Sequence, residues 1–180
     1  MNIQHILNHL NACKPALDWA DGKDLKENWE TCARGDWMLW LLRRSTLFAT
    51  DHRKFTMAKW VCANQVRHLM KDERSINALD VAFKYANNEL GISELAVAAA
   101  AAYTAVSTAA STVAADAYTA AYVAATVAAD VSAEADAASA AANAVAATVA
   151  TDDVAAAKIK MLTTCADEIR KIISWTEIQF

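Results

Sequence analysis

The feature that most constrains the fold of this chain is an alanine-dominated stretch, residues 96–157. Of its 62 residues, 32 are Ala and nine are Val, and none is Gly, Pro, Lys or Arg. Because alanine has the highest helix propensity, the stretch predicts helix and not disorder. One helix of this length would run about 93 Å, far beyond the diameter of a domain. We therefore expect the stretch to fold back into two or three helices.

The charges within this stretch indicate where it breaks. An unbroken helix would place Asp116, Asp130 and Glu134 on one face. The same face would carry Val123 and Val127, which mixes polar with apolar positions. The helical register is therefore predicted to change between Asp116 and Glu134.

The first half, residues 1–95, has a mixed composition and is rich in Trp. Helix-start signals are predicted at Pro15, at Asp24 with Glu27, at Asp36 and at Asp72. Gly22 is expected in a turn and Gly91 near a helix end. The run Trp37 to Leu42 is apolar all round and predicts a central helix. Helical spacing predicts four apolar faces: Ile3, Ile6, Leu7 and Leu10; Leu25, Trp29 and Cys32; Phe55, Ala58, Cys62, Gln65, Val66 and Leu69; and Ile76, Leu79, Phe83, Ala86 and Leu90.

A last helix is predicted after the start signal Thr151-Asp152-Asp153. Its buried stripe is expected to be Ile159, Leu162, Ala166, Ile169, Ile172 and Ile173. No run of β-branched residues has the period of a strand. The pattern predicts an all-α fold, a compact multi-helix bundle in one domain, residues 1–180. Within it, the alanine-rich half, residues 96–180, is expected to contain closely packed helices, because small side chains let helix axes approach each other.

Charge and cysteine usage limit the class of protein. The 17 basic and 21 acidic residues give a net charge of −4, and no Lys or Arg cluster exceeds two residues, which argues against binding of nucleic acid or of an anionic membrane. Residues 1–10 lack the pattern of a secretory signal. The four scattered Cys are typical of reduced thiols, so we expect a cytoplasmic protein in which they are buried small hydrophobes. Residues 96–115 carry no charge, but they are mainly Ala, which does not favour membrane insertion.

Residues with catalytic or metal-binding chemistry are sparse. His5, His9 and Cys13 have helical spacing, but the helix is expected to end near Cys13 and no fourth ligand is indicated, so no metal site is predicted. His52 and His68 lie among basic residues and are interpreted as solvated surface. With three Gly in the chain, no phosphate-binding loop or dinucleotide motif can form, so no cofactor is predicted.

Charged clusters border the most apolar segments. Arg34-Gly35-Asp36 spells an adhesion tripeptide, but we interpret Asp36 as a helix cap. A second set is interpreted as a structural network that joins helix ends: Arg43, Arg44, Asp72, Glu73, Arg74, Asp167, Glu168 and Arg170. The functional alternatives are an acid/base site of paired carboxylates, drawn from Asp72, Glu73 and Asp167, and a polar pocket between helices, formed by Arg34, Arg43, Asp72 and Asp167.

The acidic residues of the alanine-rich stretch are the candidate partner-binding site. The stretch carries six acids and no basic residue, whereas residues 1–95 carry 13 basic and 12 acidic residues. An acidic face on rigid helices would attract a basic protein partner. The residues assigned to it are Asp116, Asp130, Glu134 and Asp136, with Asp152 and Asp153 adding to the same charge.

Several stretches, taken in order along the chain, also carry a family resemblance. They are Arg34-Gly35-Asp36-Trp37-Met38-Leu39-Trp40, Asp72-Glu73-Arg74 leading into Ala78-Leu79-Asp80-Val81-Ala82, the alanine tract, and Cys165-Ala166-Asp167-Glu168-Ile169-Arg170-Lys171-Ile172-Ile173. Together they resemble the alanine-rich immunity proteins of bacterial polymorphic toxin systems, which also occur in phages. The chain departs from that pattern at Ser75, where members often carry Pro, and in having no His beyond His68.

The resemblance implies an all-α protein that binds and neutralises a protein toxin or effector. It implies no catalytic residue, so the leading hypothesis is a non-catalytic, cytoplasmic inhibitor. One alternative is a phage-encoded inhibitor of a host defence protein. Another is a small-ligand-binding protein or an enzyme with a polar pocket between helices. Association of the chain with itself is left open by the sequence.

Overall fold

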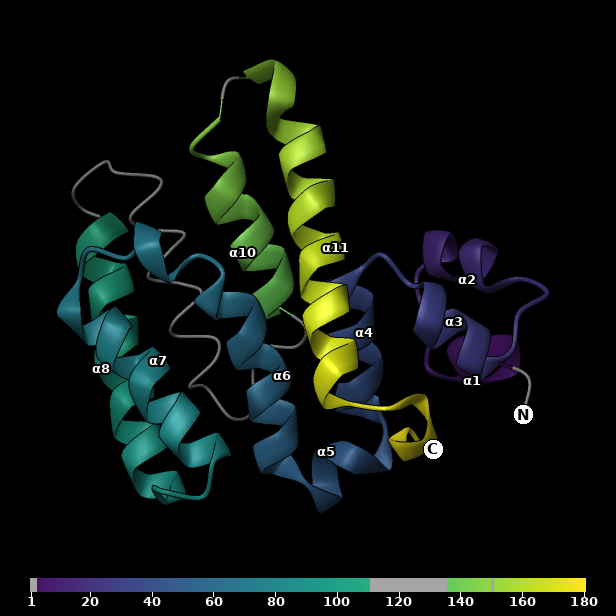
Figure 1. Ribbon diagram of the computed structural model, residues 1–180, viewed down its shortest axis with the longest axis horizontal. Helices are drawn as coiled ribbons and strands as arrows, with labels where there is room; N and C mark the ends of the chain where they lie inside the picture. The colour runs from purple at the N-terminus through teal and green to yellow at the C-terminus, as the bar shows by residue number, and fades with distance from the viewer. Residues whose placement is uncertain (1–2, 111–135, 150) are drawn as a thin grey trace.

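The computed structural model describes residues 3–110, 136–149 and 151–180, and in this part of the chain the regular elements are all helices (Figure 1). The prediction of an all-α fold is confirmed. The helices are α1 (Ile3–His9), α2 (Lys14–Ala20), α3 (Leu25–Thr31), α4 (Gly35–Arg44), α5 (Thr46–Thr50), α6 (His52–Asn64), η1 (Arg67–Leu69), α7 (Glu73–Ala86), α8 (Ile92–Ala110), α10 (Asp136–Ala146), η2 (Thr151–Asp153), α11 (Val154–Ile172) and η3 (Trp175–Glu177).

Four helices, α4, α6, α10 and α11, contact one another and form the centre of the molecule. Helices α7 and α8 pack together on one side, and α1, α2 and α3 lie on the other (Figure 1). The main core runs from Trp29 in α3 through α4 and α6 to Leu95 in α8 and Ile173 after α11. A smaller cluster joins α1 and α2 to α4; its buried residues are Ile3, Ile6, Leu7, Ala20 and Leu41.

Alanine fills the centre of the bundle where α10 meets α4, α6 and α11. Seven Ala of α10 are buried, including Ala138, Ala141 and Ala144, which are fully enclosed. Because helices surround α10 on several sides, larger side chains at these positions would overpack the core. In the described part of the alanine-rich half, α10 is therefore closely packed against its neighbours, as predicted. The predicted break between Asp116 and Glu134 lies outside the described residues.

Gly35 allows α4 to begin directly against α11. A Cβ atom at this position would lie 2.6 Å from Cys165 Cβ and 3.0 Å from the backbone N of Ala166. The second contact is with backbone, which cannot move aside as the end of a side chain can. Gly35 is thus required by close packing, which explains the Gly within the Arg34-Gly35-Asp36 tripeptide.

We expect Gly35→Ala to lower the free energy of unfolding by about 1–3 kcal/mol, because the added methyl group overpacks the contact between α4 and α11. Gly91→Ala is the matched control: its nearest contact, at 2.9 Å, is the movable carboxylate of Glu94. Urea denaturation should show a clear loss of the free energy of unfolding for Gly35→Ala, and a change within about 0.5 kcal/mol for Gly91→Ala. Equal effects of the two variants would contradict this account of Gly35.

Several predicted helix starts are confirmed, and one is wrong. Asp24 accepts the N–H of Glu27 at 2.8 Å, Asp72 accepts that of Arg74 at 2.9 Å, and Pro15 lies in the first turn of α2. Asp36 is not the cap of α4, because the helix already begins at Gly35. Its carboxylate instead accepts two guanidinium N–H groups of Arg34, at 2.9 and 2.6 Å.

Two of the predicted apolar stripes are partly wrong. Ile159 is 65% exposed, because it lies on the part of α11 that extends beyond the core. Phe83 is 39% exposed and its ring packs on Trp60, whereas Tyr85 supplies the buried aromatic ring of α7. Helix α7 also ends at Ala86, before the position predicted near Gly91, and the chain turns at Asn88 with φ of 63°.

The cysteines and His52 also depart from expectation in part. Cys32, Cys62 and Cys165 are buried as predicted, but Cys13 is exposed because it precedes α2 at the surface. His52 is not solvated surface, since its ring lies among the rings of Phe48, Phe55 and Tyr85. None of the described helices is long and apolar enough to span a membrane.

The C-terminal segment returns to the bundle and binds across two helices. The backbone N–H of Thr46 donates to the carbonyl of Gln179 at 2.8 Å, and Lys54 of α6 pairs with Glu177. Glu177 also accepts the backbone N–H of Ser174 at 2.9 Å, which completes a capping box on η3. The Lys54 ammonium and this N–H hold the pKa of Glu177 below its usual range.

The stabilising contribution of Glu177 is therefore expected to depend on pH. A carboxyl with a depressed pKa stabilises the fold above the pKa of the unfolded chain, about 4.3, and loses that contribution as pH falls through the folded value. Glu177→Gln should lower the melting temperature at pH 7, with the difference from the parent shrinking below about pH 4. Glu30→Gln, at an exposed surface pair with Lys26, is the control. A pH-independent difference at Glu177 would contradict this reading.

Candidate functional site

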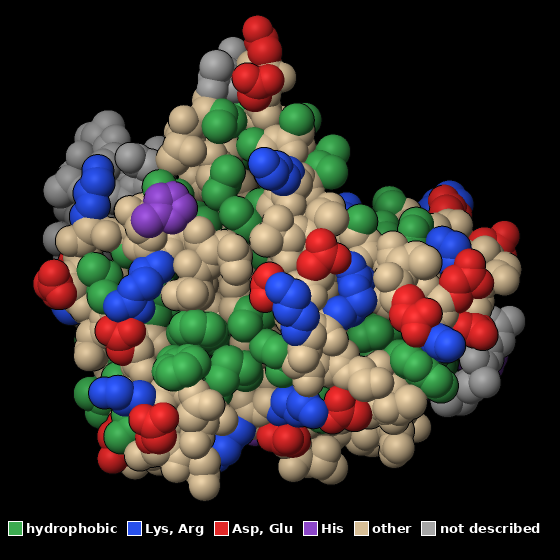
Figure 2. Space-filling model, viewed as in Figure 1, with side chains coloured by type: hydrophobic (Ala, Val, Ile, Leu, Met, Phe, Trp, Pro, Cys, Tyr) green, Lys and Arg blue, Asp and Glu red, His purple; other side chains and the backbone are tan. Residues whose placement is uncertain are grey.

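Helices α10 and α11 form a hairpin that projects beyond the rest of the molecule (Figure 1). Asp152 and Asp153 lie exposed in η2 at its tip, and Figure 2 shows acidic side chains at the far end of this projection. Ala155, Ala156 and Ile159 continue as exposed positions along the first turns of α11. We call these five residues the hairpin tip.

The hairpin tip combines two negative charges with apolar side chains on a helical support. Exposed apolar side chains beside charges are typical of a protein contact surface. Of the acids assigned from the sequence, Asp136 is the first residue of α10. Asp116, Asp130 and Glu134 lie outside the described residues, so their assignment to the partner-binding face stays a prediction.

The three charged motifs hold helix ends within the described structure. Arg34, which precedes α4, pairs with Asp36 in the first turn of that helix. The Arg34 guanidinium also lies over the Trp37 ring. Asp72 caps α7 and pairs with Arg74 at 2.7 Å. The Arg74 guanidinium holds the pKa of Asp72 below its usual range. These contacts are consistent with the predicted structural role, and each of these two motifs acts at its own helix.

The third motif, which contains Arg170, joins α11 to α3, two helices that are far apart in the sequence. Nη1 of Arg170 in α11 donates to the carbonyl oxygens of Trp29 and Cys32, at 3.0 and 2.7 Å. Nη2 of the same side chain pairs with Asp167 at 2.6 Å. In return, Nε1 of Trp29 donates to the carbonyl of Ile173 at 3.1 Å. The carbonyls at the end of α3 would otherwise lack partners, so Arg170 satisfies them and fixes α3 against α11.

We expect Arg170→Lys to lower the free energy of unfolding by about 1–3 kcal/mol. A lysine ammonium keeps the charge but cannot reproduce the planar fork that reaches both carbonyls and Asp167. Lys171→Gln is the neighbouring control, because Lys171 is 67% exposed and binds only Glu168 among its described contacts. Chemical denaturation of both variants measures the effect. A change at position 171 as large as that at position 170 would contradict the bracing role.

The polar pocket expected from Arg34, Arg43, Asp72 and Asp167 is not assembled in the described structure. Arg43 lies 3.7 Å from the centre of the Phe48 ring, and the other three bind Asp36, Arg74 and Arg170. Within the described residues, no hydrogen bond or ion pair joins any two of these four. The paired-carboxylate alternative likewise finds Asp72 and Asp167 on different helices, each with its own arginine.

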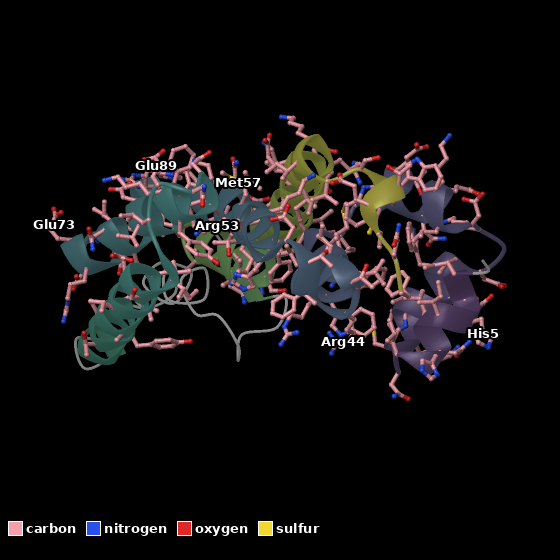
Figure 3. All side chains as sticks on the ribbon, turned by 90° about the horizontal axis from the view of Figure 1, so that it is seen from below. His5, Arg44, Arg53, Met57, Glu73 and Glu89 are labelled. Atoms are coloured by element: carbon pink, nitrogen blue, oxygen red, sulfur yellow. The ribbon has the colours of Figure 1, made fainter. Side chains whose placement is uncertain are left out.

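The histidine and cysteine candidates are distributed over separate elements. His5 and His9 are exposed on α1 (Figure 3 labels His5), whereas Cys13 precedes α2 as its N-cap residue. The described residues contain no group of three His, Cys, Asp or Glu side chains placed to hold a metal ion. Nδ1 of His52 lies 3.1 Å from the hydroxyl of Tyr85, and His68 is exposed in η1. Burial raises the pKa of the Cys32 and Cys62 thiols, which disfavours the thiolates that a nucleophile requires.

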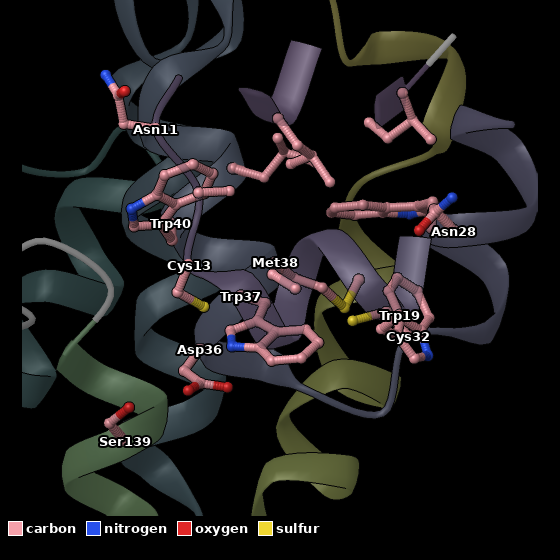
Figure 4. A pocket seen from close by; sticks show the side chains of 16 residues that line it. Asn11, Cys13, Trp19, Asn28, Cys32, Asp36, Trp37, Met38, Trp40 and Ser139 are labelled. Atoms are coloured by element: carbon pink, nitrogen blue, oxygen red, sulfur yellow. The ribbon is translucent and has the colours of Figure 1, made fainter. Parts of the chain in front are cut away.

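A cavity of about 360 Å³ lies where α1, α2 and α3 meet α4 (Figure 4). Trp19, Trp29, Trp37 and Trp40 line it, together with the sulfur-bearing side chains Cys13, Cys32 and Met38. Its polar lining includes Asn28, Asp36 and Ser139. The concentration of Trp before residue 41 is a signal of an aromatic cluster, but it could not locate this cavity, because the rings come from three helices.

Comparison with models of protein families, with curated proteins and with solved structures found no match to this chain. The resemblance to immunity proteins therefore rests on the sequence motifs alone.

Proposed function

We propose that this chain is an immunity protein of the polymorphic-toxin type, which binds a protein toxin and neutralises it by covering its active surface. The observation that carries the proposal is the use of the three charged motifs. These are the residues on which the family resemblance rests, and in this chain they cap, pair and brace helices. Motifs of that kind preserve a scaffold, which fits a protein that acts through its shape and surface without catalysis.

The hairpin tip is the contact surface we assign to the partner. It offers exposed acids and apolar side chains on two helices that are anchored in the core. Asp136 begins α10, at the end of that helix away from the tip, so the acids assigned from the sequence, Asp130, Glu134 and Asp136 among them, are a separate candidate surface for a partner with a basic active surface, such as a nuclease. We place this interaction in the cytoplasm, and neither nucleic acid nor membrane is a proposed partner.

The direct test is purification of the tagged chain from its native host, followed by identification of what binds in stoichiometric amount. A toxin encoded beside the gene, whose activity is titrated to zero by one equivalent of the chain, is the expected result. A host defence protein would instead support the alternative of a phage-encoded inhibitor. A neighbouring toxin that neither binds the chain nor loses activity would overturn the immunity assignment.

Neutralising the acids of the hairpin tip should slow association with the partner. We expect Asp152→Asn with Asp153→Asn to reduce the association rate constant about fivefold at low salt, with the difference vanishing at high salt. The Asp153 side chain makes no cap hydrogen bond to α11, so replacement by Asn removes charge without removing a helix cap. Asp21→Asn with Glu89→Gln removes the same charge from exposed positions elsewhere. Equal slowing by both pairs would exclude a specific role of the hairpin tip.

The acids assigned from the sequence need a separate test, because most of them lie outside the described residues. Reversal of Asp130, Glu134 and Asp136 to Lys should slow association further if they belong to the contact face. Stopped-flow measurement at low ionic strength resolves the rate. An unchanged association rate would remove these three residues from the interface while leaving the hairpin tip untouched.

A further inference from the structure

Four of the six Trp of this chain surround one cavity, although they come from three different helices. Trp19 lies in α2, Trp29 in α3, and Trp37 and Trp40 in α4. The rings of Trp19 and Trp37 have their centres 6.0 Å apart. A cavity of about 360 Å³ falls within the range of sites that take small organic ligands, which are lined mainly by aromatic and apolar groups. Aromatic walls favour a planar molecule that can stack or meet them edge to face.

Asn28 contributes the polar group that the protein leaves without a partner. Its side-chain amide lines the cavity and the residue is only 5% exposed. Nδ2 donates to the carbonyl of Asp24 at 2.9 Å, whereas Oδ1 is enclosed and has no hydrogen-bond partner among the described residues. A buried acceptor without a donor destabilises the fold. Because Oδ1 has almost no accessible surface in this conformation, the N–H or O–H of a ligand reaches it after the Asn28 side chain rotates toward the cavity.

The charges around the cavity indicate the charge of the ligand. Lys23, Arg34 and Arg44 lie over the rings of Trp19, Trp37 and Trp40, at 3.9, 4.5 and 4.2 Å from the ring centres. These rings therefore already interact with cations of the protein, which disfavours a cationic ligand. Asp36, the only charged residue in the described lining, is paired with Arg34, so its charge is balanced and the described lining offers no unpaired ion to a charged ligand. An uncharged ligand fits best.

We propose that this cavity is a binding site for a small, planar, uncharged molecule that carries one hydrogen-bond donor. The aromatic walls hold its plane, and Oδ1 of Asn28 accepts its donor. The site is separate from the hairpin tip, since its lining comes from the region of α1 to α4 and from Ser139 of α10, whereas the tip lies in η2 and the first turns of α11. A ligand that binds there would also stabilise the packing of the N-terminal helices on α4, because it contacts both.

Indole and N-methylindole are the probes that test this site on the full chain. They have nearly the same shape, but only indole carries an N–H. Calorimetry should give a dissociation constant for indole below about 1 mM, and roughly tenfold weaker binding for N-methylindole, because the latter leaves Oδ1 of Asn28 unpaired. Failure of indole to bind, equal binding of the two probes, or tighter binding of tetramethylammonium than of indole would each overturn the proposal.

Variants then locate the binding. Asn28→Leu should abolish the preference for indole over N-methylindole. Trp37→Leu should raise the dissociation constant of indole at least fivefold, because an aromatic contact is lost. Trp175→Leu is the control, because Trp175 lies in η3, is 37% exposed and does not line the cavity. Circular dichroism checks that each variant is folded. Indole binding that survives Trp37→Leu but is lost with Trp175→Leu would place it elsewhere and overturn the site. If Asn28→Leu does not fold, the two probes on the parent chain still decide.

Discussion

The position of α3 against α11 depends on the hydrogen bonds of the Arg170 side chain. Its guanidinium binds the carbonyls of Trp29 and Cys32 together with the carboxylate of Asp167. Arginine suits this position because its rigid fork serves several acceptors at once and its charge strengthens each bond. The carbonyls at the end of a helix carry partial negative charge, so a cation there is stabilised by the helix dipole as well as by its hydrogen bonds. In this way a residue of α11 sets where α3 lies.

The placement of α3 in turn determines the cavity. Trp29 and Asn28 are brought to its wall by α3, and Met38, which also contacts the Arg170 guanidinium at 3.7 Å, is presented by α4. Gly35 acts at the start of α4. Because it has no side chain, this end of α4 can touch α11. Two of the charged motifs thus act on the same region: one brings α4 close to α11, and the other holds α3 there. The cavity is a consequence of how these helix ends are joined.

The alanine-rich helices have a different role, because they supply rigidity with little side-chain bulk. Seven buried Ala of α10 let it lie among α4, α6 and α11 while its hairpin partner α11 extends outward. Such a hairpin is well suited to present a surface, since the anchored part fixes the geometry of the exposed tip. This arrangement unites the bracing motifs and the proposed protein contact in one scaffold: the motifs hold the helices, and the helices hold the tip.

The all-α fold and most helix starts could be predicted from the sequence, because propensity, capping and periodicity are local properties that neighbouring residues specify. The exposure of Ile159 could not be predicted, because it depends on how far α11 extends past its neighbours. Nor could the role of Asp36, which binds Arg34 two residues earlier instead of the free amides of its helix. The sequence also did not indicate which groups Arg170 binds, or that four Trp line one cavity. Those residues are separated by up to 141 positions for the pair Trp29 and Arg170, and only the packing of helices brings them together. Tertiary structure decided these features because they depend on the directions of whole helices, which no local pattern records.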